Sequence, residues 1–435
     1  MSPTDRHIET LGPAANCLYL NGLAMIFNAK NEVLRRRCTA RARVAVVVAL
    51  VAVLGVLGVS PAQAIETTAR EALLMDFDTG TVMLEKNADD PMPPSSMSKL
   101  MTTFMVFEQL KAGRMSLDDT FTVSENAWQK GGAASGGSTM FLDPNSSVRL
   151  EDLLRGIIVQ SGNDACIVVA EHLAGTEEAF ADSMNRRAPE IGLAHSVFQN
   201  STGLPHPEHS MTARDLATLA KRIITDFPEY YPYYSEKEFS YNGITQHNRN
   251  PLLYKNVGAD GLKTGHTSVA GYGLTASAQN NGRRLILVLN GLESTRARAE
   301  ESERLMSWGF RTFENVEMFK PGATVSDAEV WLGQTETVPL VLPDGLTVTL
   351  PRNARRTMKV LVRYDGPIPA PIARGQEIAT LVIEAPDIQP ISFPLQAGTN
   401  VERMGIVNRM FAALRHIVLG LVIPEPEGST AIGGT

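Results

Sequence analysis

Apolar residues follow a strand pattern near both ends of the segment 65–318. Residues 72–84 (ALLMDFDTGTVML) contain two apolar runs around an Asp-Thr-Gly turn, which predicts a β-hairpin. Residues 271–278 and 284–292 alternate or run apolar, which indicates core strands. Helices are expected between these strands, so the pattern predicts an α+β domain.

The helical segments have apolar residues at three- or four-residue spacing. The first follows Ser96, contains Leu100, Phe104, Phe107 and Leu110, and is expected to end at Gly113. Further helices are predicted over residues 150–159, 164–173 (ended by Gly175), 212–226 (with Thr212 as N-cap) and 299–313. Residues 131–139 (GGAASGGST) are expected to form a flexible loop.

The pattern changes after Pro321, and we place a domain boundary at 318/319. Short β-branched or alternating runs at 335–342, 346–350, 358–364 and 377–384 are separated by Gly- and Pro-containing turns. They predict a small all-β domain over residues 319–398. No nucleophile–base pair occurs in it, so we expect it to position or space the first domain.

Residues 399–423 predict an amphipathic helix, and residues 424–435 predict a disordered tail. Apolar residues recur at helical spacing, with basic residues at other positions. Such a helix could pack on the β domain or self-associate. Its position near the C-terminus and its basic residues favour binding to an anionic membrane surface.

Residues 1–64 predict an N-terminal extension with a cleaved signal peptide. A basic run (RRRCTARAR) precedes an apolar core of 16 residues (44–59) and an A-x-A signal at residues 62–64. A retained transmembrane anchor is the alternative, but the core is short for a membrane span. We therefore expect an exported protein at the periplasmic face of the bacterial inner membrane.

Charge and cysteine content exclude several functions for the exported part. Residues 1–64 carry seven Lys and Arg and three Asp and Glu, so their removal changes the formal net charge from −7 to −11. Such an acidic chain is not expected to bind nucleic acid. Cys166 is then the only cysteine, which excludes a disulfide framework, and we expect it to be a buried core residue.

No metal or cofactor site is expected. His206, His209 and His247 lack metal-ligand spacing, so we expect them to be surface residues. Arg214 is expected to have a structural role.

The stretch Ser96-Met97-Ser98-Lys99 carries candidate chemistry. Residues i and i+3 share a helix face, so the hydroxyl of Ser96 and the ammonium of Lys99 can converge. A serine is a weak nucleophile until a base takes its proton. A lysine in the first helical turn can be that base if burial, the helix N-terminus and other cations lower its pKa.

Two further motifs make this signal specific. Ser161-Gly162-Asn163 lies between two predicted helices, and Lys263-Thr264-Gly265 directly precedes a predicted core strand. A lysine and a threonine on an edge strand can hold a carboxylate, and Gly265 would keep that edge open for substrate backbone. The ordered set S-x-x-K, S-x-N and K-T-G is far less probable by chance than any one of its members.

With these motifs the sequence resembles the penicillin-recognising serine enzymes, and most closely the low-molecular-weight penicillin-binding proteins that are D-alanyl-D-alanine carboxypeptidases. The flanking runs SGNDAC, DGLKTGHT-x-x-AGY and WGF strengthen the match. The resemblance implies a transpeptidase-like α+β fold, an antiparallel sheet with helices, followed by the small all-β domain.

The resemblance also implies roles for individual residues. Ser96 would attack the penultimate D-alanine carbonyl of a peptidoglycan stem peptide, with Lys99 as base and Ser161 as proton relay. Backbone N–H groups of Ser96 and His266 would form the oxyanion hole. The substrate-binding residues would be Asn163, Lys263, Thr264, Gly265, His266 and Arg298, although Arg298 could equally be a solvated arginine at a helix start. β-Lactams would acylate Ser96 stably.

Three alternatives remain at this stage. A β-lactamase of the first class needs a glutamate in an E-x-x-L-N setting between the second and third motifs, and Glu177, Glu178 and Glu190 do not have it. A D,D-endopeptidase would use the same site. A non-catalytic wall-binding scaffold would not require Ser96 together with Lys99.

Overall fold

The computed structural model describes residues 65–384, 390–406 and 429–432. The predicted signal peptide, residues 407–423 of the predicted C-terminal helix and most of the tail lie outside these residues. The chain divides into residues 1–65 and residues 66–435, and the second unit is the one described below. Among the described residues, no helix combines the length and the apolar character needed to cross a membrane.

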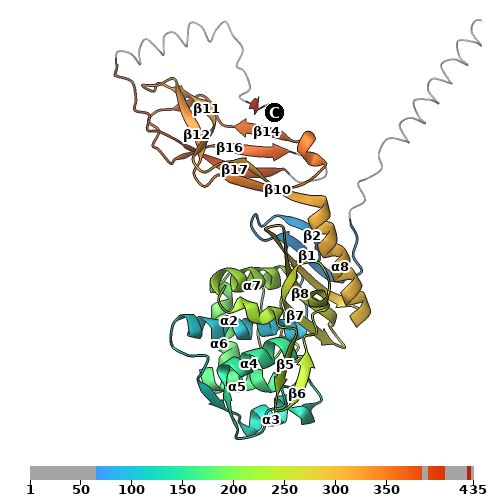
Figure 1. The fold of residues 1–435 in the computed structure, drawn as a ribbon. Helices are drawn as coiled ribbons and strands as arrows, with labels where there is room; N and C mark the ends of the chain where they lie inside the picture. Colours follow the sequence, from blue (N-terminus) through green and yellow to red (C-terminus); the bar gives the residue numbers. More distant parts are fainter. Residues whose placement is uncertain (1–64, 385–389, 407–428, 433–435) are drawn as a thin grey trace, which may run out of the picture. The chain divides into compact units, whose positions relative to one another are not determined.

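A five-stranded antiparallel sheet lies at the centre of the first domain (Figure 1). In spatial order its strands are β2 (Val82–Lys86), β1 (Glu71–Asp76), β9 (Arg283–Leu292), β8 (Gly271–Asn280) and β7 (Ala259–Thr267). The predicted hairpin and the two predicted core strands are confirmed. β8 and β9 each contain a run of six buried residues, because helices cover both faces of the sheet.

Figure 1 shows α8 (Thr295–Thr312) on one face of this sheet and the other helices on the opposite side. These helices are α2 (Lys99–Lys111), α3 (Glu125–Gly131), α4 (Leu150–Arg155), α5 (Asn163–Ala174), α6 (Glu177–Glu190) and α7 (Ala213–Asp226). Two small two-stranded sheets accompany them: β3 (Thr120–Thr122) with β4 (Ser147–Arg149), and the hairpin of β5 (Glu238–Tyr241) with β6 (Ile244–His247).

The predicted helix ends are largely confirmed. The Thr212 side chain accepts a hydrogen bond from Asp215 N, and Gly113 and Gly175 follow their helices with positive φ. Two boundaries were wrong. The helix predicted at 150–159 is α only to Arg155 and continues as a π turn (Gly156–Gln160), which apolar spacing does not distinguish. The helix predicted from residue 299 already begins at Thr295, because Ser294 caps it.

A cluster of aromatic rings packs α2 against the segment after α7. Phe104 and Phe107 are fully buried, and their rings lie 5.1 and 5.7 Å from the ring of Phe227. Phe107 also stacks on Tyr230 at 5.2 Å. This packing fixes the helix that begins with Lys99.

The second domain has a hydrophobic core of its own. Its strands are β10 (Phe313–Phe319), β11 (Ala323–Trp331), β12 (Thr337–Leu342), β13 (Leu346–Pro351), β14 (Lys359–Arg363), β15 (Ile368–Pro369), β16 (Glu377–Glu384), β17 (Ile391–Ala397) and β18 (Ser429–Ile432). β10 pairs with β13, and the others form one sheet in the order β15-β11-β12-β17-β16-β14-β18. β10 starts six residues before the predicted boundary of 319, so the β structure begins earlier than expected. The division of the chain into domains otherwise stays a prediction.

The predicted C-terminal helix begins too early. Val401 is buried and forms a β-bridge with Ile372, and Arg403 forms a bridge with Gly333. Residues 399–405 are therefore extended chain that belongs to the β domain. Among the described residues of this segment, only Ile406 is helical.

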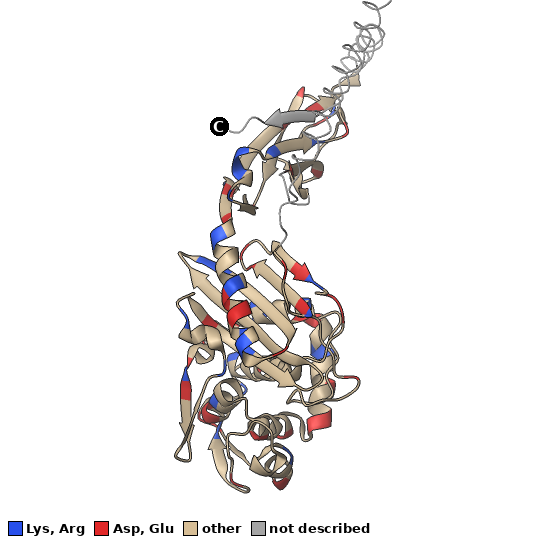
Figure 2. Ribbon diagram, turned by 90° about the vertical axis from the view of Figure 1, so that its right-hand side faces the viewer, with Lys and Arg blue, Asp and Glu red and all other residues tan. Residues whose placement is uncertain are grey.

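Charged residues lie mainly outside the central strands, as Figure 2 shows for the first domain. α8 carries both signs along its length, and Arg296 pairs with Glu300 and Arg304 with Glu301 on its surface. Arg214 bonds Glu85 and Asp89, which is the structural role expected for it.

We expect Phe104→Ala to destabilise the first domain by about 3–5 kcal/mol, because it removes a fully buried ring from the α2 contact. Urea denaturation followed by tryptophan fluorescence measures the change. Ile244→Ala, at a side chain that is 39% exposed, serves as control and should change stability by less than about 1 kcal/mol. Equal losses in the two variants would contradict the prediction.

Candidate active site

Ser96 lies in a tight turn directly before α2. Ser95 has a φ of 52°, and the 3₁₀ turn Ser95–Ser98 leads into the helix at Lys99. Ser96 is partly exposed, whereas Lys99 is 0% exposed. The serine hydroxyl is therefore accessible, and the lysine lies beneath it.

Lys99 makes the contact with Ser96 that its spacing predicts. Its Nζ lies 3.0 Å from Ser96 Oγ, 2.7 Å from Asn163 Oδ1 and 2.6 Å from the carbonyl oxygen of Thr202. An ammonium has three N–H donors, and these three oxygens use all of them. When Lys99 is a neutral amine, its two N–H groups would donate to Asn163 Oδ1 and to the Thr202 carbonyl oxygen. Its lone pair would then face the Ser96 hydroxyl.

The surroundings of Lys99 lower its pKa. Burial is the main cause and brings the pKa from 10.5 to about 8, and Arg249 acts in the same direction. Asp164 and Glu177 act in the opposite direction. Burial raises the pKa of the Cys166 thiol to about 12, so this neighbour is uncharged at neutral pH. The low pKa makes Lys99 suitable as a general base near neutral pH.

Two glycines allow the turn at Ser95 to be enclosed. A Cβ at Gly203, whose φ is +75°, would lie 2.0 Å from the Ser95 carbonyl oxygen. A Cβ at Gly265 would lie 3.0 Å from both Pro94 O and Ser95 Cβ. Gly265 therefore lets β7 approach the nucleophile turn, which differs from the expected role of leaving room for substrate.

The S-x-N motif connects the π turn to α5. Ser161 adopts the left-handed conformation with a φ of 62°, and α5 begins at Asn163. Both side chains are buried, at 2% and 4% exposure. The motif thus brings Asn163 to Lys99 as expected, while the Ser161 hydroxyl makes no hydrogen bond to another described residue.

The loop 131–139 is fixed at its end, contrary to the expectation of a flexible loop. The buried carboxylate of Asp164 accepts hydrogen bonds from Thr139 Oγ1 at 2.6 Å and from the backbone N–H groups of Met140 and Leu142. The Ser138 hydroxyl accepts one from Arg249 at 2.6 Å. Asp164 directly follows Asn163, so the loop end and the motif are held together.

The K-T-G motif lies on β7, the edge strand of the sheet, as predicted. Lys263 and Thr264 are 3% and 7% exposed. Burial, and then the charges of Lys99 and Arg249, hold the pKa of Lys263 well below 10.5, and Arg298 adds to this effect. The positive charges around Lys263 thus form one cluster, which consists of Lys99, Lys263, Arg249 and Arg298.

These four cations have no carboxylate ion pair in the part of the chain that the structure describes. Lys99 and Arg249 bond neutral side chains and a carbonyl, and Lys263 contacts the Thr264 carbonyl at 3.4 Å. Arg298, 7% exposed, is at 3.4–3.5 Å from the carbonyls of Gly273 and Arg249, and its Nε has no partner. An unpaired cationic cluster of this kind is suited to an anionic ligand.

His266 is exposed at the end of this motif. Its ring stacks on Tyr272 at 3.9 Å, and the guanidinium of Arg298 lies 5.7 Å from the same Tyr272 ring. Tyr272 therefore links the residue after K-T-G to Arg298, which places Arg298 at the site rather than in solvent.

The prediction for His209 was wrong, whereas His206 and His247 are exposed as expected. His209 is 4% exposed, because its ring packs at 5.8 Å from Phe198 and its Nδ1 accepts a hydrogen bond from Gln199 N. Burial lowers its pKa to about 4, so it is neutral at pH 7. Among the described residues no group of His, Cys, Asp and Glu could hold a metal ion.

A hollow of about 530 Å³ adjoins the nucleophile turn and the end of β7. Ser95 and Thr267 line it on the side of the site, and Pro91, Leu204 and Val269 make its walls largely apolar. Leu204 and Val269 are exposed at 42% and 67%. Such a surface can bind a peptide in an extended conformation next to Ser96.

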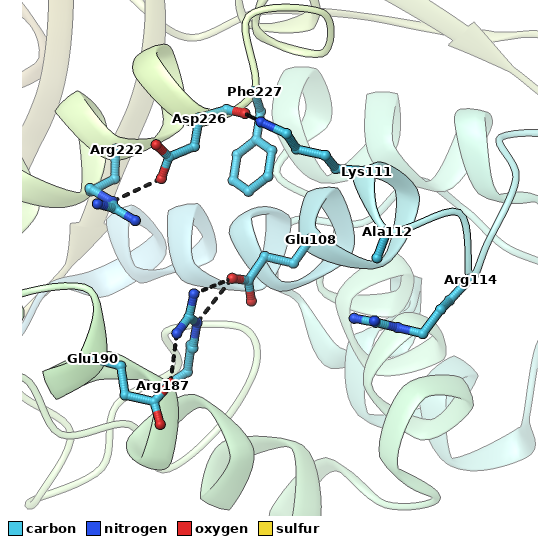
Figure 3. Close-up of a pocket in the computed structure, with 9 residues that line it drawn as sticks. All are labelled: Glu108, Lys111, Ala112, Arg114, Arg187, Glu190, Arg222, Asp226 and Phe227. Carbon is cyan, nitrogen blue, oxygen red and sulfur yellow. Dashed lines mark hydrogen bonds and ion pairs between the residues drawn. The ribbon is translucent and has the colours of Figure 1, made fainter.

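Figure 3 shows a second hollow, at the C-terminal end of α2. There Arg187 pairs with Glu108 and Glu190, and Arg222 pairs with Asp226. The Arg187–Glu108 pair ties α6 to α2, and Lys111 of α2, roughly 18 Å along the helix from Lys99, donates to the Asp226 carbonyl at the end of α7. The hollow therefore belongs to the packing of the helices.

Sequence reasoning missed three contributors to the site: Thr202, Asp164 and Arg249. Thr202 acts through its backbone carbonyl, and because every residue has one, the residue type gives no indication of this role. Asp164 adjoins a motif, but its position predicts only a helix residue. Arg249 lies between two asparagines before β7 and carries no motif of its own.

Comparison with known proteins agrees with this geometry. A family model described as D-alanyl-D-alanine carboxypeptidase matches residues 58–293, and one described as Penicillin-binding protein 5, C-terminal domain, matches residues 313–403. The start of the second match coincides with the start of β10.

Individual relatives cover most of the chain. It is 42% identical over 346 residues to D-alanyl-D-alanine carboxypeptidase DacC of Escherichia coli, covering 79% of this chain and 86% of that protein. It is 38% identical to DacA of Haemophilus influenzae, covering 84% and 92%. The crystal structure of penicillin binding protein 5 from Haemophilus influenzae is similar with a TM-score of 0.69 at 38% identity, covering 80% of this chain and all of that one.

We expect acylation of Ser96 by a fluorescent penicillin to become faster as pH rises. Only neutral Lys99 can accept the proton, so the rate should rise by about tenfold per pH unit well below pH 8 and level off above it. Stopped-flow or gel labelling between pH 5.5 and 9 measures this. Lys99→Arg, which stays protonated, should abolish labelling. A wild-type rate that is flat across this range would contradict a base with this pKa.

Proposed function

The chain belongs to the D-alanyl-D-alanine carboxypeptidase family, and on this basis we propose that it removes the terminal D-alanine from peptidoglycan stem pentapeptides with Ser96 as nucleophile. The observation that carries the assignment of Ser96 is its 3.0 Å contact with a buried lysine of lowered pKa. The role of the protein is therefore in cell-wall biosynthesis and remodelling.

In the first step, Ser96 Oγ attacks the carbonyl carbon of the penultimate D-alanine, and Lys99 takes the hydroxyl proton. Backbone N–H groups of Ser96 and His266 stabilise the oxyanion. The C–N bond breaks, and Ser161 relays a proton to the nitrogen of the leaving D-alanine. Water then hydrolyses the acyl-enzyme.

The terminal carboxylate of the substrate binds to the cationic cluster. Lys263 and Thr264 come from the edge strand, and Arg298 lies beneath it, without a carboxylate partner among the described residues. Binding a carboxylate there compensates charges that burial otherwise penalises. Asn163 keeps Lys99 oriented, and Gly265 lets β7 lie close to Ser96.

The remainder of the stem peptide extends along β7 into the apolar hollow. If the carboxylate lies at Thr264 and the scissile carbonyl at His266, the acyl side continues toward Thr267 and Val269. Both residues line the hollow beside Ser95. β-Lactams occupy the same position as the terminal dipeptide and acylate Ser96.

We further propose that the protein is exported and attached to the periplasmic face of the inner membrane by a helix within residues 406–423. Apolar residues at helical spacing and basic residues at other positions of this segment support its binding to an anionic membrane surface.

We expect Ser96→Ala to abolish both D-alanine release and labelling by a fluorescent penicillin. The wild-type protein from residue 65 onward should give a stable label on a denaturing gel, because the acyl bond to Ser96 is covalent. A wild-type protein that carries no label but hydrolyses penicillin would be a β-lactamase. One that does neither would be a binding scaffold, and either result would reject the proposed function.

Removal of residues 407–435 should release an active enzyme from the membrane fraction. The cut is placed after Ile406 because Val401 and Arg403 belong to the β domain. It also removes the edge strand β18 beside β14, so activity is expected from the first domain, which keeps all of its strands and helices. Fractionation followed by penicillin labelling measures both properties. An anchor elsewhere would be indicated if the shortened protein still sedimented with membranes.

A further inference from the structure

The Thr202 carbonyl that accepts a hydrogen bond from Lys99 belongs to a tightly held turn. Ser201 and Thr202 are 0% and 1% exposed. Thr102 Oγ1 donates to the Ser201 carbonyl at 2.6 Å, and Asn200 Oδ1 accepts from the backbone N–H groups of Thr202 and Gly203. The position of this carbonyl is therefore set by side chains around the turn.

Glu177 holds the same turn from another helix. It is the first residue of α6, and its Oε1 accepts hydrogen bonds from Ser201 N at 3.0 Å and from Ser201 Oγ at 2.6 Å. Hydrogen bonds to a charged acceptor such as a carboxylate are stronger than those between neutral groups. Nothing in the reaction steps described above uses this carboxylate.

We propose that Glu177 is a positioning residue of the reaction: through Ser201 it holds the Thr202 carbonyl against Lys99 and so directs the Lys99 lone pair at the Ser96 hydroxyl. The inference rests on the proposed roles of Ser96 and Lys99. A neutral amine that has lost one of its two acceptors can rotate away from the serine, and misplacement of a reacting group by about 1 Å can cost about a hundredfold in rate.

Glu177 also acts on Lys99 through its charge. Its carboxylate and that of Asp164 on α5 favour the ammonium form. Burial opposes this, as does the charge of Arg249, while the nearby His209 is neutral at pH 7. Lys263 on β7 is a further titratable neighbour, and the charge of Lys99 lowers its pKa. Removing the charge of Glu177 therefore lowers the pKa of Lys99, which shifts the pH dependence of the rate. Loss of positioning instead lowers the rate at high pH, where Lys99 is already neutral.

The test compares Glu177→Gln and Glu177→Ala with Glu178→Ala as matched control. Glu178 is the next residue of α6 and is exposed, and among the described residues its carboxylate bonds at the helix start, with its own backbone N–H and with Thr176. The second-order rate constant of acylation by a fluorescent penicillin is measured from pH 5.5 to 9, together with the melting temperature of each variant.

Glu177→Ala should lower the rate at pH 8.5 by between about tenfold and about a hundredfold. Glu177→Gln keeps an oxygen that accepts from Ser201, so its rate above pH 8 should stay within about twofold of wild type. Its acid limb should move to lower pH by less than about one unit. Glu178→Ala should match the wild type in both respects.

The inference is overturned if Glu177→Ala acylates at the wild-type rate, or if Glu178→Ala loses as much activity. If Glu177→Ala does not fold, Ser201→Ala replaces it, since it removes only one of the two bonds to Glu177, and an unchanged rate there overturns the inference. Failure of the wild-type protein to become labelled would instead reject the proposed function.

Discussion

The site depends on a lysine that is kept out of water without a carboxylate partner. Burying an ammonium costs free energy unless hydrogen bonds replace its water, and Lys99 has three oxygens in place of that water. Only one of these oxygens, Ser96 Oγ, is the proposed nucleophile. The aromatic packing of α2, the fixed end of loop 131–139 and the enclosed turn at Thr202 all serve to keep the other two in place. The low pKa of Lys99 is a consequence of this arrangement.

The cationic cluster extends the same principle to substrate binding. Lys263 and Arg298 are buried beside other cations and lack a carboxylate among the described residues. The folded chain thus holds positive charge that only an incoming anion can neutralise. Binding energy from the substrate carboxylate is available there, at the end of the peptide that the reaction removes. The motifs on α2 and β7 thereby contribute cations to one cluster, although 164 positions separate Lys99 from Lys263 in the sequence.

The sequence predicted those parts of the site that side-chain identity and local periodicity encode. The spacing of Ser96 and Lys99 on a helix, the edge position of Lys263 and the cap at Thr212 are local properties, and they are found as predicted. Thr202 could not be found, because a backbone carbonyl has no residue-specific signal. The burial of His209 and the extended path of residues 399–405 arise from tertiary contacts with Phe198 and Ile372. The π turn before Ser161 has the same apolar spacing as an α-helix.

The edge position of β7 has a consequence beyond catalysis. An edge strand offers unpaired backbone groups to any other strand, and a long apolar edge promotes pairing between copies of a protein. In the proposed binding mode β7 leaves this edge free for its substrate, and β7 is the last strand of the five-stranded sheet. Lys263 is already buried on this strand without a carboxylate partner among the described residues, and an apolar strand that paired with the edge would bring no group that neutralises it. The residue proposed to receive the carboxylate would thereby favour an anionic partner over an apolar strand at this edge, which works against self-association.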